Sequence, residues 1–412
     1  MTTKQHIPIL DGLRFLAAFF VAAAHFVDWT IAGPAAAPVV RVITDFSNLG
    51  MATFFVLSGF VIHYNYHDLR KTPGGIRRFF EARFARLYPL YIVLLTIDVL
   101  ISMLYHRTSC GLAGDTPGSL MALPYFLTMT QSWTYGVICN NSFIYQFHVV
   151  SAVMWSISVE AFFYIVYVFI ANWLGRVNET KRQFAVALGF YGVSVAVLWW
   201  FWRSPGTIEH VAQVTFGPIA TERHGYQDSL IRWLNYFNPV SNLPAFVCGA
   251  VAANTYMGRH KPKPGQSETR WAGPLVVLTS LCMLAVHFWF TIGLAPRNMF
   301  FDRCGSVLYV PFMALSIYTM ARYPATTVTK MVGSSALVKL GEASYSIYLL
   351  HALLGRLPKH LSFLHLNPWL LCGISLAIVL TVSRISYLKF ERPAQKWVRD
   401  KLRGPAVRAQ YA

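Results

Sequence analysis

The sequence predicts an all-α polytopic membrane protein, a bundle of about ten transmembrane helices with both termini in the cytoplasm. Of its 412 residues, 55% are hydrophobic and only 13% are charged, whereas soluble proteins carry about 25% charged residues. The apolar residues recur in runs of about 20, the length at which a helix crosses a bilayer. Most Lys and Arg residues lie between these runs, which gives the expected bundle a direction across the membrane.

Each expected span is an apolar run bounded by polar or charged loop residues. The ten runs are Gly12–Ile31, Leu49–Tyr66, Leu87–Tyr105, Trp155–Leu174, Phe184–Trp202, Pro239–Tyr256, Gly273–Gly293, Cys304–Ala321, Leu337–Leu354 and Pro368–Leu388. The stretch Leu120–Trp133 is also apolar, but it is short and contains Pro124. We therefore expect an interfacial or loop segment there.

The distribution of positive charge supports this topology. With the N-terminus inside, 24 of the 35 Lys and Arg residues fall in cytoplasmic segments, 9 fall in outer loops, and Arg14 and Arg384 lie within spans. The net charge of +18 is thus typical of topogenic charge, and no basic domain is expected to hold a nucleic acid. The first run lacks a basic leader and a small-residue cleavage site, so we expect it to remain as the first span.

The six cysteines form no CxxC pair and no Cys/His metal spacing, so no metal site is expected. Cys110 and Cys139 share the long outer loop Tyr105–Met154. If that loop faces the periplasm, a disulfide between them is chemically allowed, and two free thiols are an equally open alternative. This loop and the outer loop Arg203–Asn238 are rich in Tyr, Trp, Asn, Gln and His, which favours either a sugar-like site or an ordinary interfacial belt.

The first apolar segment, Ile7–Trp29, which contains most of the first span, carries four ionisable residues, Asp11, Arg14, His25 and Asp28. Such residues are costly inside a membrane and usually functional. Arg14 and His25 are eleven positions apart, which places both on one helix face, about 16 Å apart along the axis. One face of this helix therefore offers a cation near the inner surface and an imidazole near the outer surface.

A cationic cluster is expected at the inner surface, just before the third span. It consists of Arg77, Arg78, Arg83 and Arg86, of which the last two share a helix face. Guanidinium groups match phosphate geometry, while charge for lipid headgroups is an equally open alternative. The other members of this expected inner layer are Asp11, Arg14, His63 and Glu391, the last in a salt bridge that stabilises the bundle.

An outer layer is expected around His25. Glu160 lies in a span that enters from outside, so it should lie at the depth of His25. We expect a His25–Glu160 or His25–Asp28 pair, in which the carboxylate orients the imidazole and stabilises its charged form. His351, near the outer end of the ninth span, joins this layer.

The second span contains small residues that suit close helix packing. Gly50 and Gly59 let neighbouring helices approach. Ser58 lies between them without a G-x-S-x-G motif, so we expect its hydroxyl to bond its own helix rather than to act as a nucleophile.

Six motifs make the chain resemble the acyltransferase-3 family of membrane acyltransferases over nearly its whole length. They are Leu10-Asp11-Gly12-Leu13-Arg14 with ten residues before His25, Phe54-Phe55-Val56-Leu57-Ser58-Gly59-Phe60, Arg83-x-x-Arg86-Leu-Tyr-Pro89, Trp155-Ser156-Ile157-Ser158-Val159-Glu160, Ser344-Tyr345-Ser346-Ile347-Tyr348-Leu349-Leu350-His351 and Glu391-Arg392-Pro393. Each motif alone is weak, but six in family order on spans of matching orientation are specific together.

The resemblance implies an O-acyltransferase that moves an acyl group, most often acetyl, from cytoplasmic acyl-CoA to a hydroxyl of an extracytoplasmic glycan or glycolipid. It implies Arg14 and His25 at the active site, and we add Glu160 as a third catalytic residue. Arg83 and Arg86, with Arg14, are expected to bind the CoA phosphates. The residues expected to contact substrate are Asp28, Trp155, Ser156, Tyr345 and His351.

The resemblance also bears on domains and partners. Residues 1–393 are expected to form the transmembrane acyltransferase domain, and residues 394–412 a short basic cytoplasmic tail. Some family members carry an SGNH-type domain, so here any such partner is expected to be a separate periplasmic protein, or the transfer is expected to be direct. Membrane lipids and a saccharide acceptor are the other expected partners, and a bacterial inner membrane is the expected location.

Two other classes remain open at this point. In a transporter or flippase of a glycan intermediate, Arg14, His25 and Glu160 would form a proton relay. A non-catalytic membrane scaffold is the third reading. If a deletion strain loses acyl ester from its extracted glycan, that loss distinguishes the enzyme from the transporter and the scaffold.

Overall fold

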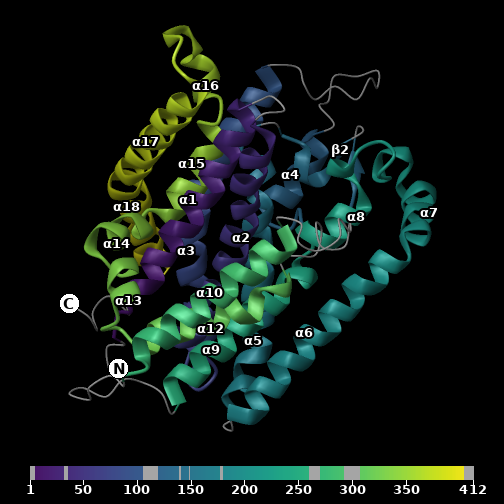
Figure 1. Ribbon diagram of the computed structural model, residues 1–412. Coiled ribbons are helices and arrows are strands. Elements are labelled where there is room, and N and C mark those ends of the chain that lie inside the picture. The colour runs from purple at the N-terminus through teal and green to yellow at the C-terminus, as the bar shows by residue number, and fades with distance from the viewer. Residues whose placement is uncertain are drawn as a thin grey trace.

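The computed structural model describes residues 5–31, 36–104, 119–138, 141–147, 149–176, 180–258, 270–291 and 307–402, which are almost entirely helical (Figure 1). The longer helices are α1 (Pro8–Thr30), α2 (Ala37–Tyr66), α3 (Gly75–Leu104), α5 (Ser151–Arg176), α6 (Thr180–Arg203), α7 (Pro205–Phe216), α9 (Pro239–Gly258), α10 (Ala272–Thr291), α12 (Val310–Arg322), α15 (Ser344–Leu353), α17 (Pro368–Ser386) and α18 (Arg392–Leu402).

Shorter elements connect these helices. The short α-helices are α4 (Ser119–Leu127), α8 (Leu230–Arg232), α13 (Thr327–Val332), α14 (Ser335–Glu342) and α16 (Leu357–His360). The strands β1 (Val137–Ile138) and β2 (Asn141–Ser142) pair antiparallel. The 3₁₀ or π-helical segments are η1 (Phe143–Tyr145), η2 (Pro218–Ala220), η3 (Tyr226–Asp228), η4 (Trp233–Phe237), η5 (Ser362–Leu364) and η6 (Tyr387–Glu391).

Within the described ranges, seven helices are long and apolar enough to cross a membrane. They correspond to predicted spans one to five, seven and ten, in the segments Pro8–Thr30, Ala37–Tyr66, Gly75–Leu104, Ser151–Leu174, Lys181–Phe201, Ala272–Trp289 and Pro368–Leu402. The all-α membrane bundle is thus confirmed, whereas the count of ten remains a prediction. Leu120–Trp133, expected as an interfacial segment, contains the nine-residue helix α4, which is too short to span.

The predicted sixth span is the centrally packed helix α9. It is 20 residues long but is not one of the seven helices whose length and hydropathy meet those of a membrane span. Fourteen of its residues are buried, and it packs against α2, α5, α6 and α12. A helix surrounded by protein needs less apolarity than one that faces lipid, since its polar groups can find partners within the bundle.

The predicted ninth span, Leu337–Leu354, is not one continuous helix. It divides at Ala343 into α14 and α15, and α14 packs against α1. Gly341 makes this contact close, because a Cβ there would lie 1.9 Å from the carbonyl oxygen of Asp11. Gly12 likewise brings α1 close to α13, since a Cβ there would lie 1.9 Å from the carbonyl oxygen of Val332. The break lets α14 lie against the start of α1, while α15 continues into the bundle.

Five helices begin four or more residues before their apolar runs. The predicted starts Gly12, Leu49, Leu87, Trp155 and Phe184 become Pro8 in α1, Ala37 in α2, Gly75 in α3, Ser151 in α5 and Thr180 in α6. Helix formation continues through residues whose polarity marked them as loop, because backbone hydrogen bonds and packing outweigh side-chain polarity there. This difference changes the depth at which each functional side chain lies.

Glycines hold α2 against α9 at the centre of the bundle. A Cβ on Gly59 would lie 1.9 Å from the carbonyl oxygen of Phe246, and one on Gly249 would lie 1.9 Å from that of Val56. The two helices thus touch backbone to backbone through reciprocal glycines. Gly50 makes a similar contact with Ala17 of α1, which confirms the close packing predicted for Gly50 and Gly59.

A buried carboxylate fixes the start of α5. The oxygens of Asp98, on α3, accept hydrogen bonds from the backbone N–H groups of Val149 (2.9 Å), Val150 (2.7 Å) and Ser151 (2.7 Å). These N–H groups precede or open the helix, where no intrahelical acceptor is available. Asp98 therefore ties α5 to α3 and sets the position of the side chains farther along α5.

Four helix ends meet at one end of the molecule. The Tyr64 hydroxyl, near the end of α2, donates to the Gln5 carbonyl (2.9 Å), just before α1. Arg77, near the start of α3, donates to the Leu402 carbonyl at the end of α18 (3.4 Å). The first and last described helices thus begin and end on the same side, as the predicted topology requires.

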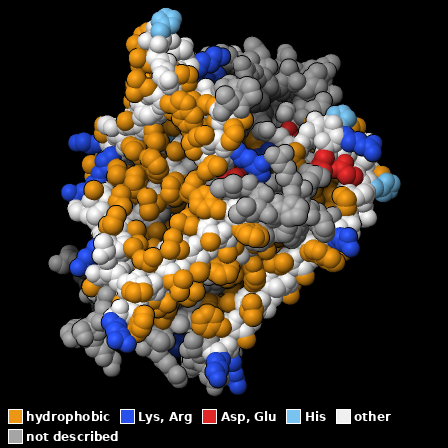
Figure 2. Space-filling view, in the orientation of Figure 1, with side chains coloured by type: hydrophobic (Ala, Val, Ile, Leu, Met, Phe, Trp, Pro, Cys, Tyr) orange, Lys and Arg blue, Asp and Glu red, His pale blue; other side chains and the backbone are white. Residues whose placement is uncertain are grey.

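The outer surface of the bundle is apolar. Figure 2 shows a broad band of hydrophobic side chains across one face, with most Lys and Arg side chains at its borders. Phe169, Leu188 and Val193 are each about two-thirds exposed (67%, 69% and 65%). Large apolar side chains with this exposure are expected where a protein faces lipid.

Two of the outer segments are joined by hydrogen bonds. Asp228 accepts from the backbone N–H and hydroxyl of Ser142 (both 2.8 Å), and the Tyr135 hydroxyl donates to the Asp228 carbonyl (2.5 Å). Burial, together with the negative charge of Asp228, raises the pKa of Tyr135, so its phenol stays protonated and can donate. Cys110 and Cys139, the expected disulfide candidates, lie outside the described residues.

Candidate active site

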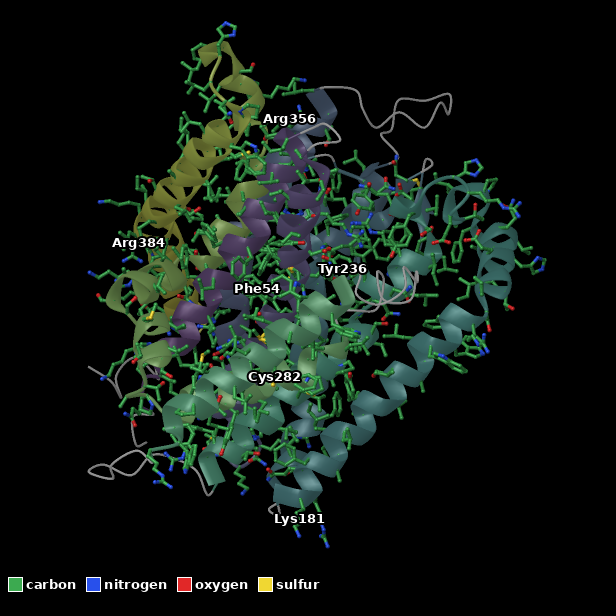
Figure 3. All side chains as sticks on the ribbon, viewed as in Figure 1. Phe54, Lys181, Tyr236, Cys282, Arg356 and Arg384 are labelled. Atoms are coloured by element: carbon green, nitrogen blue, oxygen red, sulfur yellow. The ribbon has the colours of Figure 1, made fainter. Side chains whose placement is uncertain are left out.

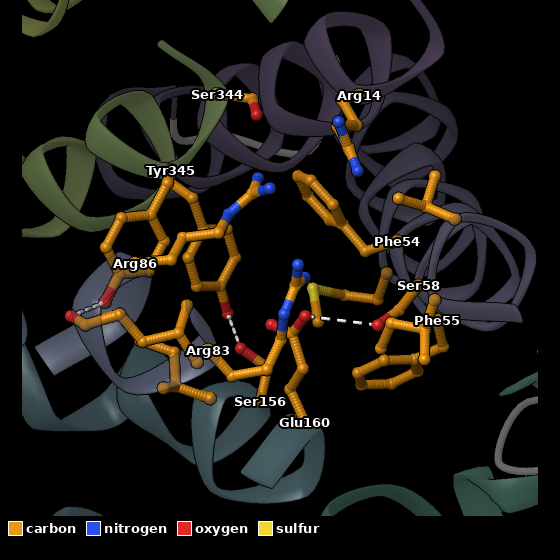
Figure 4. A pocket seen from close by; sticks show the side chains of 16 residues that line it. Arg14, Phe54, Phe55, Ser58, Arg83, Arg86, Ser156, Glu160, Ser344 and Tyr345 are labelled. Carbon is orange, nitrogen blue, oxygen red and sulfur yellow. Dashed lines mark hydrogen bonds between the residues drawn. The ribbon is translucent and has the colours of Figure 1, made fainter. Parts of the chain in front are cut away.

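A cavity lies between α1, α2, α3, α5 and α15 (Figure 4). Its walls are mixed, with apolar side chains such as Phe54 and Phe55 beside many polar ones. The polar lining residues are Arg14, Ser58, Arg83, Arg86, Ser156, Glu160, Ser344, Tyr345 and Tyr348. The fold therefore brings together six residues that the sequence singled out on four separate helices: Arg14, Arg83, Arg86, Ser156, Glu160 and Tyr345.

Three guanidinium groups give the cavity its charge. Arg14 donates to Asp11 (2.8 Å), which also contacts His6 (2.7 Å). Arg83 donates to the Tyr66 hydroxyl (3.2 Å) and lies over the Tyr66 ring, 5.1 Å from its centroid. Within the part of the chain that the structure describes, neither Arg83 nor Arg86 forms an ion pair at salt-bridge distance.

Glu160 is the one carboxylate in the cavity wall. It accepts hydrogen bonds from the hydroxyls of Tyr164 (2.6 Å) and Ser58 (3.1 Å), and it attracts the Arg83 guanidinium. The expectation for Ser58 was therefore wrong, because its hydroxyl bonds a neighbouring helix rather than its own backbone. With three arginines and one carboxylate, the cavity keeps an excess of positive charge that favours an anionic ligand.

The expected separation into inner and outer layers is also wrong for Glu160. This residue shares a cavity with Arg14 and Arg83 rather than with His25. The reason is depth: α5 begins at Ser151 and α3 at Gly75, so Glu160 and Arg83 both lie about 12–14 Å inside their helices at about 1.5 Å per residue. The two helices enter the bundle from opposite ends, so the Glu160 and Arg83 side chains lie near each other in its middle.

His25 has a different partner from either one expected. Its Nδ1 lies 2.9 Å from Nε2 of His351, on α15. The two rings are nearly parallel, 5.0 Å apart at 4°, and the Trp29 ring is parallel to His25 at 5.1 Å and 7°. The predicted His25–Glu160 and His25–Asp28 pairs are both absent: Glu160 bonds Ser58 and Tyr164, and Asp28 is exposed.

Tyr348 connects the cavity with the histidine pair. It lines the cavity, and its ring lies 5.7 Å from that of His351, three residues farther along α15. Its hydroxyl accepts from Ser156 (2.7 Å) and donates to the Val153 carbonyl (2.8 Å). One short helix thus carries both a wall of the cavity and the partner of His25.

The remaining predicted residues lie around this centre. Trp155 is outside the cavity lining, buried against Tyr236 and Phe237 with ring centroids 4.7 and 5.2 Å away. Tyr345 lines the cavity and donates to the Leu87 carbonyl (2.7 Å). Their roles toward substrate stay predictions.

Two residues of the expected inner layer form hydrogen bonds with hydroxyl groups. His63 is buried, with Nδ1 3.2 Å from the Tyr167 hydroxyl. Glu391 accepts from the Ser346 hydroxyl (2.6 Å). The salt bridge expected for Glu391 is not formed with any residue that the structure describes.

Tyr348, Tyr164 and Tyr66 are site residues that were not predicted from the sequence. Tyr348 lies three residues before His351 and Tyr164 four after Glu160, and residues at these spacings share a helix face. That spacing could have identified both. Among the described residues, no group of three or more His, Cys, Asp or Glu side chains could hold a metal ion.

A family model described as an acyltransferase domain matches residues 7–388. The chain is 27% identical over 350 residues to the acyltransferase MdmB of Streptomyces mycarofaciens, an alignment that covers 84% of this chain and 78% of that protein. It is 24% identical over 402 residues to the peptidoglycan O-acetyltransferase OatA of Listeria monocytogenes, with coverage of 96% and 56%.

The chain thus spans little more than half the length of the Listeria relative. No solved structure matches it. The family match, in contrast, extends across nearly every described helix, from the residue before α1 to the segment that follows α17. The chain therefore belongs to this acyltransferase family and carries its acyltransferase domain.

Proposed function

We propose that this protein is a membrane O-acyltransferase that moves an acyl group, with acetyl as the first candidate, from cytoplasmic acyl-CoA to a hydroxyl of an extracytoplasmic glycan or glycolipid. The named activities of relatives, which include a peptidoglycan O-acetyltransferase, support the acetyl group and a saccharide acceptor. A multi-pass location in a bacterial inner membrane belongs to the same proposal, and a separate periplasmic partner is its alternative to direct transfer.

The observation that carries the proposal is the arginine-lined cavity beside the first helix. Acyl-CoA is a polyanion, and Arg14, Arg83 and Arg86 line one cavity from two helices. Figure 4 shows the Arg14 and Arg86 side chains pointing into this space. Arg86 has no ion-pair partner within the described part of the chain, so it can bind a phosphate without first breaking a salt bridge.

The second group that the reaction needs is a base near the acceptor. His25 lies on the same helix as Arg14, about 16 Å farther along the axis. The thioester end of a donor held by the arginines would extend past Tyr348, which lies between the cavity and the histidine pair. This arrangement places phosphate binding and proton transfer at two levels of one bundle.

The proposed chemistry is a direct transfer. His25 takes the proton from the acceptor hydroxyl while the oxygen attacks the thioester carbonyl, the carbon–sulfur bond breaks, and the CoA thiolate leaves. The proton on His25 then passes to the thiolate or to water. A positioned general base contributes about 10²–10⁴-fold to the rate.

The test is substitution of His25 in a deletion strain. His25→Ala should lower base-labile acyl ester on the extracted cell-surface glycans to the level of the deletion strain, because the base is lost. The protein should still accumulate in the membrane. His360→Ala is the matched control, since this imidazole is exposed in α16, and it should retain wild-type ester content.

Two results would contradict the proposal. Wild-type ester content with His25→Ala would remove His25 from the chemistry. Unchanged ester content in the deletion strain itself, with loss of an exported glycan, would instead support the transporter alternative.

A further inference from the structure

The hydrogen bond between two imidazoles raises the question of which ring donates. His351 is fully buried (0% exposed), and its Nε2 is the only hydrogen-bond partner of His25 among the residues that the structure describes. A neutral imidazole has one N–H and one lone pair. If His25 accepts at Nδ1, its proton is on Nε2 and it cannot act there as a base; if it donates from Nδ1, Nε2 is free to accept.

The proposed role of His25 as the base decides between these alternatives. A base needs a lone pair toward the acceptor hydroxyl, and because Nδ1 of His25 already forms the 2.9 Å bond to His351, that lone pair must be on Nε2. Nδ1 of His25 then carries the proton and donates it, and the lone pair of His351 that accepts it is on Nε2.

We propose that His351 is the positioning residue of the acyl transfer: it accepts the Nδ1–H of His25, which leaves His25 Nε2 unprotonated as the base for the acceptor hydroxyl. This inference rests on the proposed function and adds how His25 keeps an unprotonated nitrogen toward the acceptor hydroxyl. A buried acceptor fixes tautomer and ring orientation in the same way in carboxylate–histidine pairs. Here the acceptor is an imidazole because both carboxylates expected near His25 lie elsewhere.

Aromatic stacking holds the pair in this orientation. The Trp29 ring lies parallel to that of His25 and, at 6.4 Å and 10°, to that of His351. Trp29 reaches this place because residue 355 is glycine: a Cβ there would lie 2.1 Å from the Trp29 ring. The rings therefore have little freedom to rotate, and the hydrogen bond keeps its direction.

The inference can be tested with two amides of different length. Glutamine places its amide group where Nε2 of histidine lies, whereas asparagine reaches only as far as Nδ1. His351→Gln should keep the bond to His25 and retain activity within about tenfold of wild type, and His351→Asn should lose kcat by about 100-fold or more. KM for acetyl-CoA should not change in either variant, because His351 is not in the cavity lining.

The measurement uses the full-length protein in detergent, acetyl-CoA as donor, and envelope glycan of the deletion strain, de-esterified with mild base, as acceptor. Thermal unfolding of each variant is measured alongside, and His351→Leu and His25→Ala are included. Equal kcat for the Gln and Asn variants, or a loss confined to KM, would overturn the role of His351 alone. Full activity of His25→Ala would overturn the proposed function, and with it this inference.

Discussion

Arg86 illustrates how much the cost of binding depends on a residue's existing partners. Arg14 is already paired with Asp11 at 2.8 Å, and Arg83 is held by the Tyr66 hydroxyl and ring. Arg86 has neither kind of contact within the described residues and lines the cavity. When a side chain breaks no existing salt bridge or hydrogen bond on binding, most of the free energy of its new charge-assisted hydrogen bond contributes to affinity.

We therefore predict that Arg86→Gln raises KM for acetyl-CoA about 10- to 100-fold, because a hydrogen bond to a charged group contributes about 1.5–3 kcal/mol. kcat should change little if the contact is equally strong in the ground and transition states. Steady-state kinetics with varied donor checks this. Arg77→Gln is the control on the same helix, since Arg77 is 77% exposed and pairs with Glu81; an equal rise in KM there would indicate a general charge effect.

At the scale of elements, contact between α2 and α9 depends on the absence of side chains. Gly59 and Gly249 each face a carbonyl oxygen of the other helix. Ser58, which lines the cavity and bonds Glu160, is adjacent to Gly59. Any displacement of α2 from α9 therefore moves a cavity wall, which couples helix packing to the geometry of the site.

Gly59→Ala should lower the stability of the folded protein by about 1–3 kcal/mol, the typical cost of overpacking, and should reduce activity. Gly189→Ala provides the comparison, because no atom lies within 4 Å of a Cβ at Gly189 of α6. That change should be neutral or stabilising by up to about 1 kcal/mol, the helix propensity difference. Thermal unfolding in detergent measures both; equal effects would show that the α2–α9 contact adapts freely.

At the scale of the whole molecule, the proposal requires two ends exposed to different compartments. Figure 3 shows Lys181, at the start of α6, and Arg356, in the turn after α15, at opposite ends of the bundle. The predicted topology places Lys181 in the cytoplasm and Arg356 outside. The arginine-lined cavity lies within this single bundle. The orientation of the bundle in the membrane therefore decides from which side the donor enters.

We predict that a membrane-impermeant maleimide labels Arg356→Cys in intact spheroplasts, whereas Lys181→Cys is labelled only after permeabilisation. Both substitutions are made in a variant whose six native cysteines are replaced by alanine, and both side chains are exposed. The cysteine-free variant must retain ester transfer. The reverse labelling pattern would place the donor site toward the outside and exclude cytoplasmic acyl-CoA as donor.

The sequence alone determined that the chain is a helical membrane bundle and which residues carry charge inside it. It also singled out Arg14, Arg83, Arg86 and Glu160, which the structure brings into one cavity. These properties follow from local patterns, since hydropathy and helical periodicity depend on neighbours in the chain. The family resemblance followed from motifs of the same local kind, and the match over residues 7–388 confirmed it.

Only the tertiary structure decided which of these residues meet. Depth was misjudged because α3 begins twelve residues and α5 four residues before its apolar run, so Glu160 lies with the arginines instead of with His25. The His25–His351 bond joins residues 326 positions apart, and their meeting depends on how α1 and α15 are rotated and how closely glycines let them pack. Rotation and packing distance are set by contacts between helices, which no local pattern encodes.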